Sequence, residues 1–131
     1  MKSTSWSVGD VAARFDLPTN VLRHWEAVGL LAPDRDPAGR RRYSRDDVGR
    51  VAIIQRSKAA GMSLEQIGVL LDANAHGRHE ILAAHLADLD RRMEEMRISR
   101  EMTQHAFECR AHDIATCPRF RAQVEDLLVG F

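Results

Sequence analysis

The residues with the clearest capacity for chemistry lie close together near the end of the chain. Residues 105–120 read HAFECRAHDIATCPRF and contain both cysteines, Cys109 and Cys117, together with His105 and His112. Two thiolates on a short loop can bind a soft or borderline ion such as Cu(I), Zn(II), Cd(II) or Hg(II). Added histidines would complete a Cys2His or Cys2His2 set that suits tetrahedral zinc, whereas two cysteines alone suit linear Cu(I).

The same two cysteines are open to other interpretations. They can be small buried hydrophobic residues, or a thiol switch that forms a disulfide or is otherwise modified on oxidation. An iron–sulfur cluster is disfavoured, because it usually takes four thiolates and this chain has two cysteines. An enzyme that uses cysteine and histidine as nucleophile and base is not expected, because we find no Gly-rich phosphate loop or paired catalytic carboxylates.

Length and composition limit the class of protein without naming a partner. The 131 residues are 44% hydrophobic and 29% charged with zero formal net charge, which fits one modest domain or a small domain with an appendage. The basic charge is local, because residues 35–45 hold five arginines against one aspartate. No apolar run approaches the roughly 18 residues of a membrane span, and no signal peptide is evident, so we expect a cytoplasmic protein.

Two short helices are expected first, in the arrangement of a helix-turn-helix. Ser7 and Asp10 have the spacing of a capping box and begin the first helix, which a Leu-Pro step ends. Thr19 or Asn20 then caps a second helix that ends at Gly29. The short interval between these helices is typical of the turn in a helix-turn-helix.

The next segment predicts a basic hairpin and two more helices. Residues 33–43 hold prolines, a glycine and arginines, and are expected to form a hairpin-like loop. Asp46 and Asp47 open a third helix that runs to Gly61, and a capping box at residues 63–66 opens a fourth. A basic loop next to a helix-turn-helix indicates a nucleic-acid contact, although an arginine run is more often a solvated surface.

A long helix should follow, because no proline or glycine interrupts the chain from Glu80 to about Glu108. At 1.5 Å per residue, a helix of about 28 residues would be about 42 Å long. Its apolar residues repeat at alternating steps of four and three, as in a coiled-coil seam: Leu82, Leu86, Leu89, Met93 and Met96. The simplest cover for this seam is the same helix of a second copy; the alternative is that it folds back on the N-terminal helices.

Three segments in this order resemble one known family. LRHWEAVGLL, GRRRY and AAGMSLEQI, at residues 22–31, 39–43 and 59–67, resemble the DNA-binding domain of the MerR family of bacterial transcription regulators over residues 6–72. The resemblance implies a mainly α fold: a winged helix-turn-helix, a long antiparallel coiled-coil dimerisation helix, and a short C-terminal effector loop and helix. We expect the boundaries of these parts at 1–75, 76–108 and 109–131.

The resemblance and the residue chemistry together predict the DNA contacts. The helix that begins at Thr19 fits the major groove, and the arginine-rich loop can clamp phosphates. Trp25 stands where the family usually has a tyrosine that contacts the DNA backbone, although its indole can equally pack in the core. Lys58 matches a basic family position near phosphates. The predicted DNA-binding residues are Thr19, Asn20, Arg23, His24, Trp25, Arg40, Arg41, Arg42, Tyr43 and Lys58.

The family's mode of action gives the expected partners. Such regulators bind as homodimers to a pseudo-palindrome between promoter elements that are spaced too far apart. An effector then changes the distance between the two wings, and the DNA is bent and untwisted so that RNA polymerase engages both elements. This recognition includes a deformation energy that depends on base pairs the protein never touches.

The metal-sensing branch of the family has two cysteines after the long helix, the second followed by proline and a short helix. Cys109 and Cys117 match this arrangement. Divalent-ion sensors usually take a third cysteine from the start of the partner's long helix. This chain has no cysteine there, but it has two histidines. The predicted ligands are Cys109, Cys117 and His112, with His105, His76 and His79 as further candidates, for zinc or Cu(I). A thiol-responsive regulator, or one with no metal input, remains an alternative.

Overall fold

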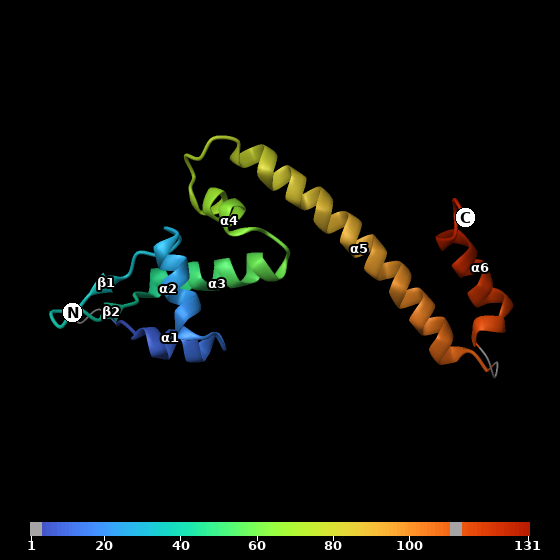
Figure 1. Ribbon diagram of the computed structural model, residues 1–131, viewed down its shortest axis with the longest axis horizontal. Helices are drawn as coiled ribbons and strands as arrows, with labels where there is room; N and C mark the ends of the chain where they lie inside the picture. Colours follow the sequence, from blue (N-terminus) through green and yellow to red (C-terminus); the bar gives the residue numbers. More distant parts are fainter. Residues whose placement is uncertain (1–3, 111–113) are drawn as a thin grey trace. The chain divides into compact units, whose positions relative to one another are not determined.

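The computed structural model describes residues 4–110 and 114–131, and in these ranges the chain is mainly helical (Figure 1). Six α-helices, one short 3-10 turn and one two-stranded hairpin follow each other along the described chain. The expected fold class is therefore confirmed. The contacts divide the chain into two units, Met1–His85 and Leu86–Phe131. None of the described helices is long and apolar enough to cross a membrane.

The first unit contains four helices and the hairpin. Its elements are α1 (Val8–Arg14), α2 (Thr19–Ala27), β1 (Asp34–Arg35), β2 (Arg41–Arg42), α3 (Arg45–Ala59) and α4 (Leu64–Leu71). The strands are antiparallel, with Asp34 opposite Arg42, so the predicted hairpin is present. In Figure 1 it lies to one side of α1, α2 and α3.

Side-chain caps explain where most of these helices begin. Both capping boxes predicted from sequence form, from Ser7 to Asp10 at α1 and from Ser63 to Gln66 at α4. The third helix begins one residue earlier than predicted, because Ser44 caps it in a further box with Asp47. Each box satisfies backbone amides that the first turn of a helix leaves without an intrahelical partner.

The start of α2 differs from the prediction. Thr19 is already helical, and the N-cap is Pro18, whose extended backbone (φ −64°, ψ 146°) precedes the first turn. Proline's fixed φ suits this position and its missing N–H costs no helical hydrogen bond. At the other end, Gly29 has φ +86°, the left-handed conformation that glycine adopts without strain, so the predicted stop is confirmed within two residues.

The core of the first unit is drawn from all its helices. Leu22, Tyr43, Val51, Ile54 and Ile67 are fully buried within a cluster that spans α1 to α4. Polar contacts fix the same elements: the Arg50 guanidinium donates two hydrogen bonds, of 3.1 and 3.0 Å, to the Leu30 carbonyl. The Gln55 amide donates to the Phe15 carbonyl at 2.8 Å and so ties α3 to the end of α1.

The long helix α5 (Arg78–Glu108) has 31 residues, which confirms the prediction of an uninterrupted helix there. It begins in the first unit, where Leu82 packs against the core, and continues into the second. None of its residues is buried, and Leu86, Met93 and Met96 are 61%, 69% and 70% exposed. A 3-10 turn (Ile114–Thr116) and α6 (Pro118–Leu127) complete the described chain.

Candidate DNA-binding surface and metal site

The outer face of α2 carries the side chains expected to read DNA. Leu22 and Trp25, three residues apart, face the core and are 0% and 4% exposed. Val21 is partly buried against the same core, whereas Asn20, Arg23 and His24 are turned outward and exposed. Thr19, at the first helical position, is half-buried. The helix thus presents polar groups over the face opposite its core contacts, as a groove-binding helix must.

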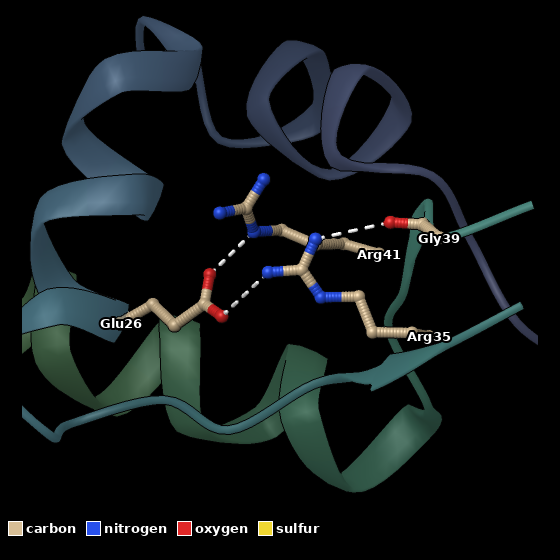
Figure 2. A network of polar contacts seen from close by, with 4 residues as sticks. All are labelled: Glu26, Arg35, Gly39 and Arg41. Carbon is tan, nitrogen blue, oxygen red and sulfur yellow. Dashed lines mark hydrogen bonds and ion pairs between the residues drawn. The ribbon is translucent and has the colours of Figure 1, made fainter.

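The hairpin is tied to α2 by an acidic residue that the sequence did not single out. Figure 2 shows the Glu26 carboxylate between the guanidinium groups of Arg35 and Arg41, one from each strand. Arg35 lies 3.3 Å from Glu26 and donates a second hydrogen bond, of 3.0 Å, to the Gly39 carbonyl. Because these contacts join α2, both strands and the loop, they fix the hairpin relative to the helix.

The three consecutive arginines of the hairpin have different surroundings. Arg40 is exposed at the loop, whereas Arg41 is half-buried and paired with Glu26. Arg42 is also half-buried and donates to the Ser5 hydroxyl at 3.0 Å and to the Ser5 carbonyl at 2.9 Å. Lys58, in the last turn of α3, is exposed. Arg41 and Arg42 therefore already make contacts within the protein, whereas Arg40 and Lys58 are exposed.

Two predicted DNA contacts lie inside the core instead of on the surface. Trp25 is 4% exposed and Tyr43 is 0% exposed, and both belong to the apolar cluster. Burial raises the pKa of Tyr43, and the nearby Glu26 carboxylate adds to the increase. Its hydroxyl is buried with no hydrogen-bond partner among the described residues. Both rings are therefore packed in the core of the first unit, and neither lies on its exposed surface.

The second unit brings three predicted ligands together. His105 and Cys109 lie at i and i+4, and the Cys109 amide donates to the His105 carbonyl at 2.8 Å as α5 ends. Cys117 directly precedes α6, whose first residue is Pro118. The Nε2 atom of His105 is 3.1 Å from the Sγ atom of Cys117. The ligand atoms of His105, Cys109 and Cys117 all lie within 4.8 Å of one another.

The position of Cys117 at a helix N-terminus favours its thiolate. Hydrogen bonding lowers its pKa to about 6, with the Phe120 backbone amide as the largest cause and the His105 side chain next. The Arg119 amide and the Cys109 side chain contribute less, and burial acts in the opposite direction. Amide groups that point out of the first turn of a helix stabilise an anion placed there. No disulfide joins the two cysteines.

The donor set fits a metal ion on chemical grounds. Two thiols and an imidazole are the groups that borderline and soft ions prefer, and Cys117 is 8% exposed while the other two are half-buried. His112 lies outside the described residues. His76 and His79 are exposed and belong to the first unit, whereas the group of three lies wholly in the second. The proximity of His105 to Cys109 could be predicted from their helical spacing. The proximity of His105 to Cys117 could not, because it depends on the path of the chain between α5 and α6.

Comparisons with known proteins agree with this arrangement. The family described as "MerR HTH family regulatory protein" matches residues 6–74, and the family described as "MerR, DNA binding" matches residues 48–106. Together the two matches run from before α1 to the last turn of α5.

Three similar proteins extend the comparison over most of the chain. HTH-type transcriptional regulator HmrR of Rhizobium leguminosarum bv. viciae is 29% identical, covering 86% of this chain and 92% of that protein. A probable heavy metal-dependent transcriptional regulator of Haemophilus influenzae is 28% identical, with 85% and 93% covered. The crystal structure of the transcription regulator PbrR691 from Ralstonia metallidurans CH34 in complex with lead(II) aligns at 25% identity and a TM-score of 0.54, with 89% and 98% covered.

The matched segments, the exposed face of α2 and the anchored hairpin lead to one conclusion. This chain belongs to the MerR family of helix-turn-helix proteins and is a DNA-binding transcriptional regulator, not an enzyme.

Proposed function

We propose that this regulator binds a pseudo-palindromic promoter as a homodimer and remodels it when a metal ion binds through Cys109 and Cys117. The observation that carries the proposal is the group of two thiols and one imidazole at the end of α5, within 4.8 Å of one another. Two similar proteins support it, since one is named as heavy metal-dependent and another was crystallised with lead(II).

The DNA contacts come from the exposed residues of the first unit. Asn20, Arg23 and His24 on α2 reach base edges or phosphates in the major groove, and the α2 N-terminus at Thr19 offers backbone amides to a phosphate. The hairpin and α3 hold phosphates on either side through Arg40, Arg41, Arg42 and Lys58. Trp25 and Tyr43 act indirectly, because they fix α2 and the hairpin from within the core.

The homodimer follows from the apolar stripe along α5. Leu86, Met93 and Met96 recur at coiled-coil spacing and are each more than 60% exposed. A stripe of this kind is stabilised when a second apolar surface excludes water from it. The same helix of a second copy, antiparallel to the first, supplies a matching stripe and places the two DNA-binding units at opposite ends of the pair.

Metal binding then acts on the ends of the paired helices. An ion shared by Cys109 and Cys117 ties the last turn of α5 to the first turn of α6 and so fixes the loop between them. A change at the end of each α5 alters the spacing of the two hairpins on DNA. The bound promoter is bent and untwisted at its centre, so that RNA polymerase engages both promoter elements.

The test is metal content and affinity, measured by elemental analysis and competition titration on anaerobically purified, reduced protein. We expect one tightly bound ion per subunit, which is lost in the double variant Cys109→Ser/Cys117→Ser and retained in Ala106→Ser, an exposed change on the same turn of α5. The same proteins are then compared in transcription from a promoter with and without the ion. If the wild-type protein binds no zinc, copper, cadmium, mercury or lead at physiological concentrations, the metal proposal fails.

A thiol-responsive regulator is the second candidate, favoured by one specific observation. The Cys117 sulfur lies close to that of Cys109 and has a pKa of about 6, so it is a thiolate at neutral pH. A thiolate of this kind can be oxidised by a peroxide to a sulfenic acid, which the second thiol converts to a disulfide with loss of water. Formation of that disulfide in metal-free protein, together with altered transcription, would favour this candidate over the metal.

A further inference from the structure

We propose that His105 is the third metal ligand, so that one subunit alone supplies a Cys2His set and selects a divalent borderline ion over Cu(I). This inference rests on the metal function proposed above and defines the chemistry of that same site. It also removes the need for a third ligand from the partner's long helix.

The positions of the three donor atoms carry the proposal. His105 Nε2 lies 3.1 Å from Cys117 Sγ, and no pair of ligand atoms in the group is farther apart than 4.8 Å. In a tetrahedral zinc site with Zn–S bonds of about 2.3 Å, two sulfurs are about 3.8 Å apart. The donors are thus already close to the spacing that such an ion requires, and small side-chain rotations would suffice to bind it.

The local backbone explains why His105 is available at this point. It lies one helical turn before Cys109, on the same face of the last turn of α5, and its carbonyl accepts the Cys109 amide. The Nε2 atom of the imidazole lies at hydrogen-bond distance from the Cys117 sulfur. A metal ion bound between these two atoms would take the place of that hydrogen bond and displace its proton.

Coordination number connects this geometry to ion selectivity. Cu(I) bound linearly by two thiolates needs no third ligand, whereas zinc and similar divalent ions have higher coordination numbers and bind both nitrogen and sulfur ligands. A histidine next to one thiolate adds affinity for the divalent ion only. His76 and His79, exposed near the start of α5, are then dispensable for binding.

The experiment uses the full-length, reduced protein with Co(II) as a spectroscopic probe, and with Zn(II) and Cu(I) in competition titrations. The test variant is His105→Gln, chosen because glutamine can still donate a hydrogen bond to Cys117. The matched control is His85→Gln, a half-buried histidine earlier on the same helix. A third protein carries His76→Gln and His79→Gln. Circular dichroism and DNA binding without metal verify that each variant is folded.

We expect His105→Gln to lower the affinity for Zn(II) and Co(II) by on the order of 100-fold. Loss of a residue that only hydrogen-bonds to a metal ligand already lowers metal affinity by about 10- to 100-fold. Its cobalt spectrum should lose the intense visible bands of a tetrahedral site, while sulfur-to-cobalt charge transfer persists. Cu(I) affinity should be unchanged, and both control proteins should match the wild type.

Two other results would overturn the inference while leaving the metal function intact. One is equal Zn(II) affinity in wild type and His105→Gln; the other is a loss of affinity in the His76→Gln/His79→Gln protein instead, which would place the third ligand at the start of α5. Failure of the wild type to bind any of the three ions would overturn this inference, and the proposed function would fail with it only if cadmium, mercury and lead were not bound either.

Discussion

The contacts inside the first unit differ in kind from the contacts inside the second. In the first, polar contacts join residues that are distant in sequence: Glu26 pairs with Arg41, and Gln55 with the Phe15 carbonyl. In the second, the ion pairs among the described residues all run three or four positions along α5, between exposed side chains such as Arg97 and Glu101.

Burial shows the same contrast. The first unit encloses a cluster of eleven buried hydrophobic residues, whereas Cys117 is the buried hydrophobic residue of the second among those described. Contacts distant in sequence specify one packing, while pairs along a helix stabilise only the helix itself. The first unit is thus stabilised by contacts of its own, whereas the second has few buried contacts among the described residues, which agrees with the partner copy and the ion proposed above.

The largest effect should come from the core of the first unit. Leu22→Ala removes a side chain that is 0% exposed, and a cavity of this kind typically costs about 2–5 kcal/mol of unfolding free energy. Urea unfolding measures the loss. The control is Val28→Ala, an exposed change at the C-cap of α2, with an expected loss within about 0.5 kcal/mol. Equal losses for the two variants would mean that burial does not determine the stability of the first unit, and the contrast with the exposed second unit would then fail.

The next effect concerns the apolar stripe of α5. Leu86→Lys places a charge where a second helix is expected to pack, and loss of a buried leucine alone costs about 1.5–3 kcal/mol, or roughly 10- to 100-fold in the dimer dissociation constant. Sedimentation equilibrium measures this constant. Ala87→Lys, the neighbouring exposed position outside the stripe, is the matched control. If both lysines act alike, the stripe is not the dimer contact.

A smaller effect is expected at the hairpin. Arg41→Gln removes a predicted phosphate contact, which should weaken binding to all DNA sequences and reduce the salt dependence, as the slope of log K against log salt, by about 1 per contact. Glu26→Gln is the companion variant, because it removes the intramolecular partner and leaves the arginine. An unchanged slope in Arg41→Gln would mean that Arg41 serves only to hold the hairpin against α2.

The same contrast explains what could be predicted from the sequence. Capping boxes at Ser7 and Ser63, the uninterrupted α5 and the hairpin depend on neighbouring residues, so their patterns are visible in the chain itself. The pairing of Glu26 with both strands was missed, because it forms only after the hairpin folds back on α2. No local signal distinguishes this glutamate from any exposed one on a helix.

The candidate metal site was predictable in part, for the same reason. Residue type and spacing indicated Cys109 and Cys117, and helical periodicity placed His105 beside Cys109. The histidine that lies near Cys117 is determined by the path of the chain between α5 and α6, and this path cannot be derived from the spacing of residues in the sequence. Burial of Trp25 and Tyr43 was similarly hidden, since an aromatic side chain suits a phosphate contact and a core equally well.

The pH dependence of the metal-free second unit should reveal its thiolate. Because the pKa of Cys117 is lowered from 9.0 to about 6, the folded state favours the thiolate, and this stabilisation is complete above about pH 9 and lost as pH falls through about 6. The difference in unfolding midpoint between wild type and Cys117→Ser should therefore increase from pH 6 to pH 9. A constant difference would show that the α6 N-terminus does not stabilise the anion.

The smallest effect is expected at the exposed ion pairs of α5. Arg97 is hydrogen-bonded to Glu94 and Glu101 on the exposed surface of α5, and these carboxylates raise the pKa of its guanidinium. Solvent and salt screen such pairs, and holding two long side chains together costs entropy, so their net contribution is small. Arg97→Gln should leave the urea midpoint unchanged within error, at low salt and more so at high salt. A large, salt-sensitive loss would mean that these charges form a network, and that the second unit is held more firmly by its own contacts than its exposure indicates.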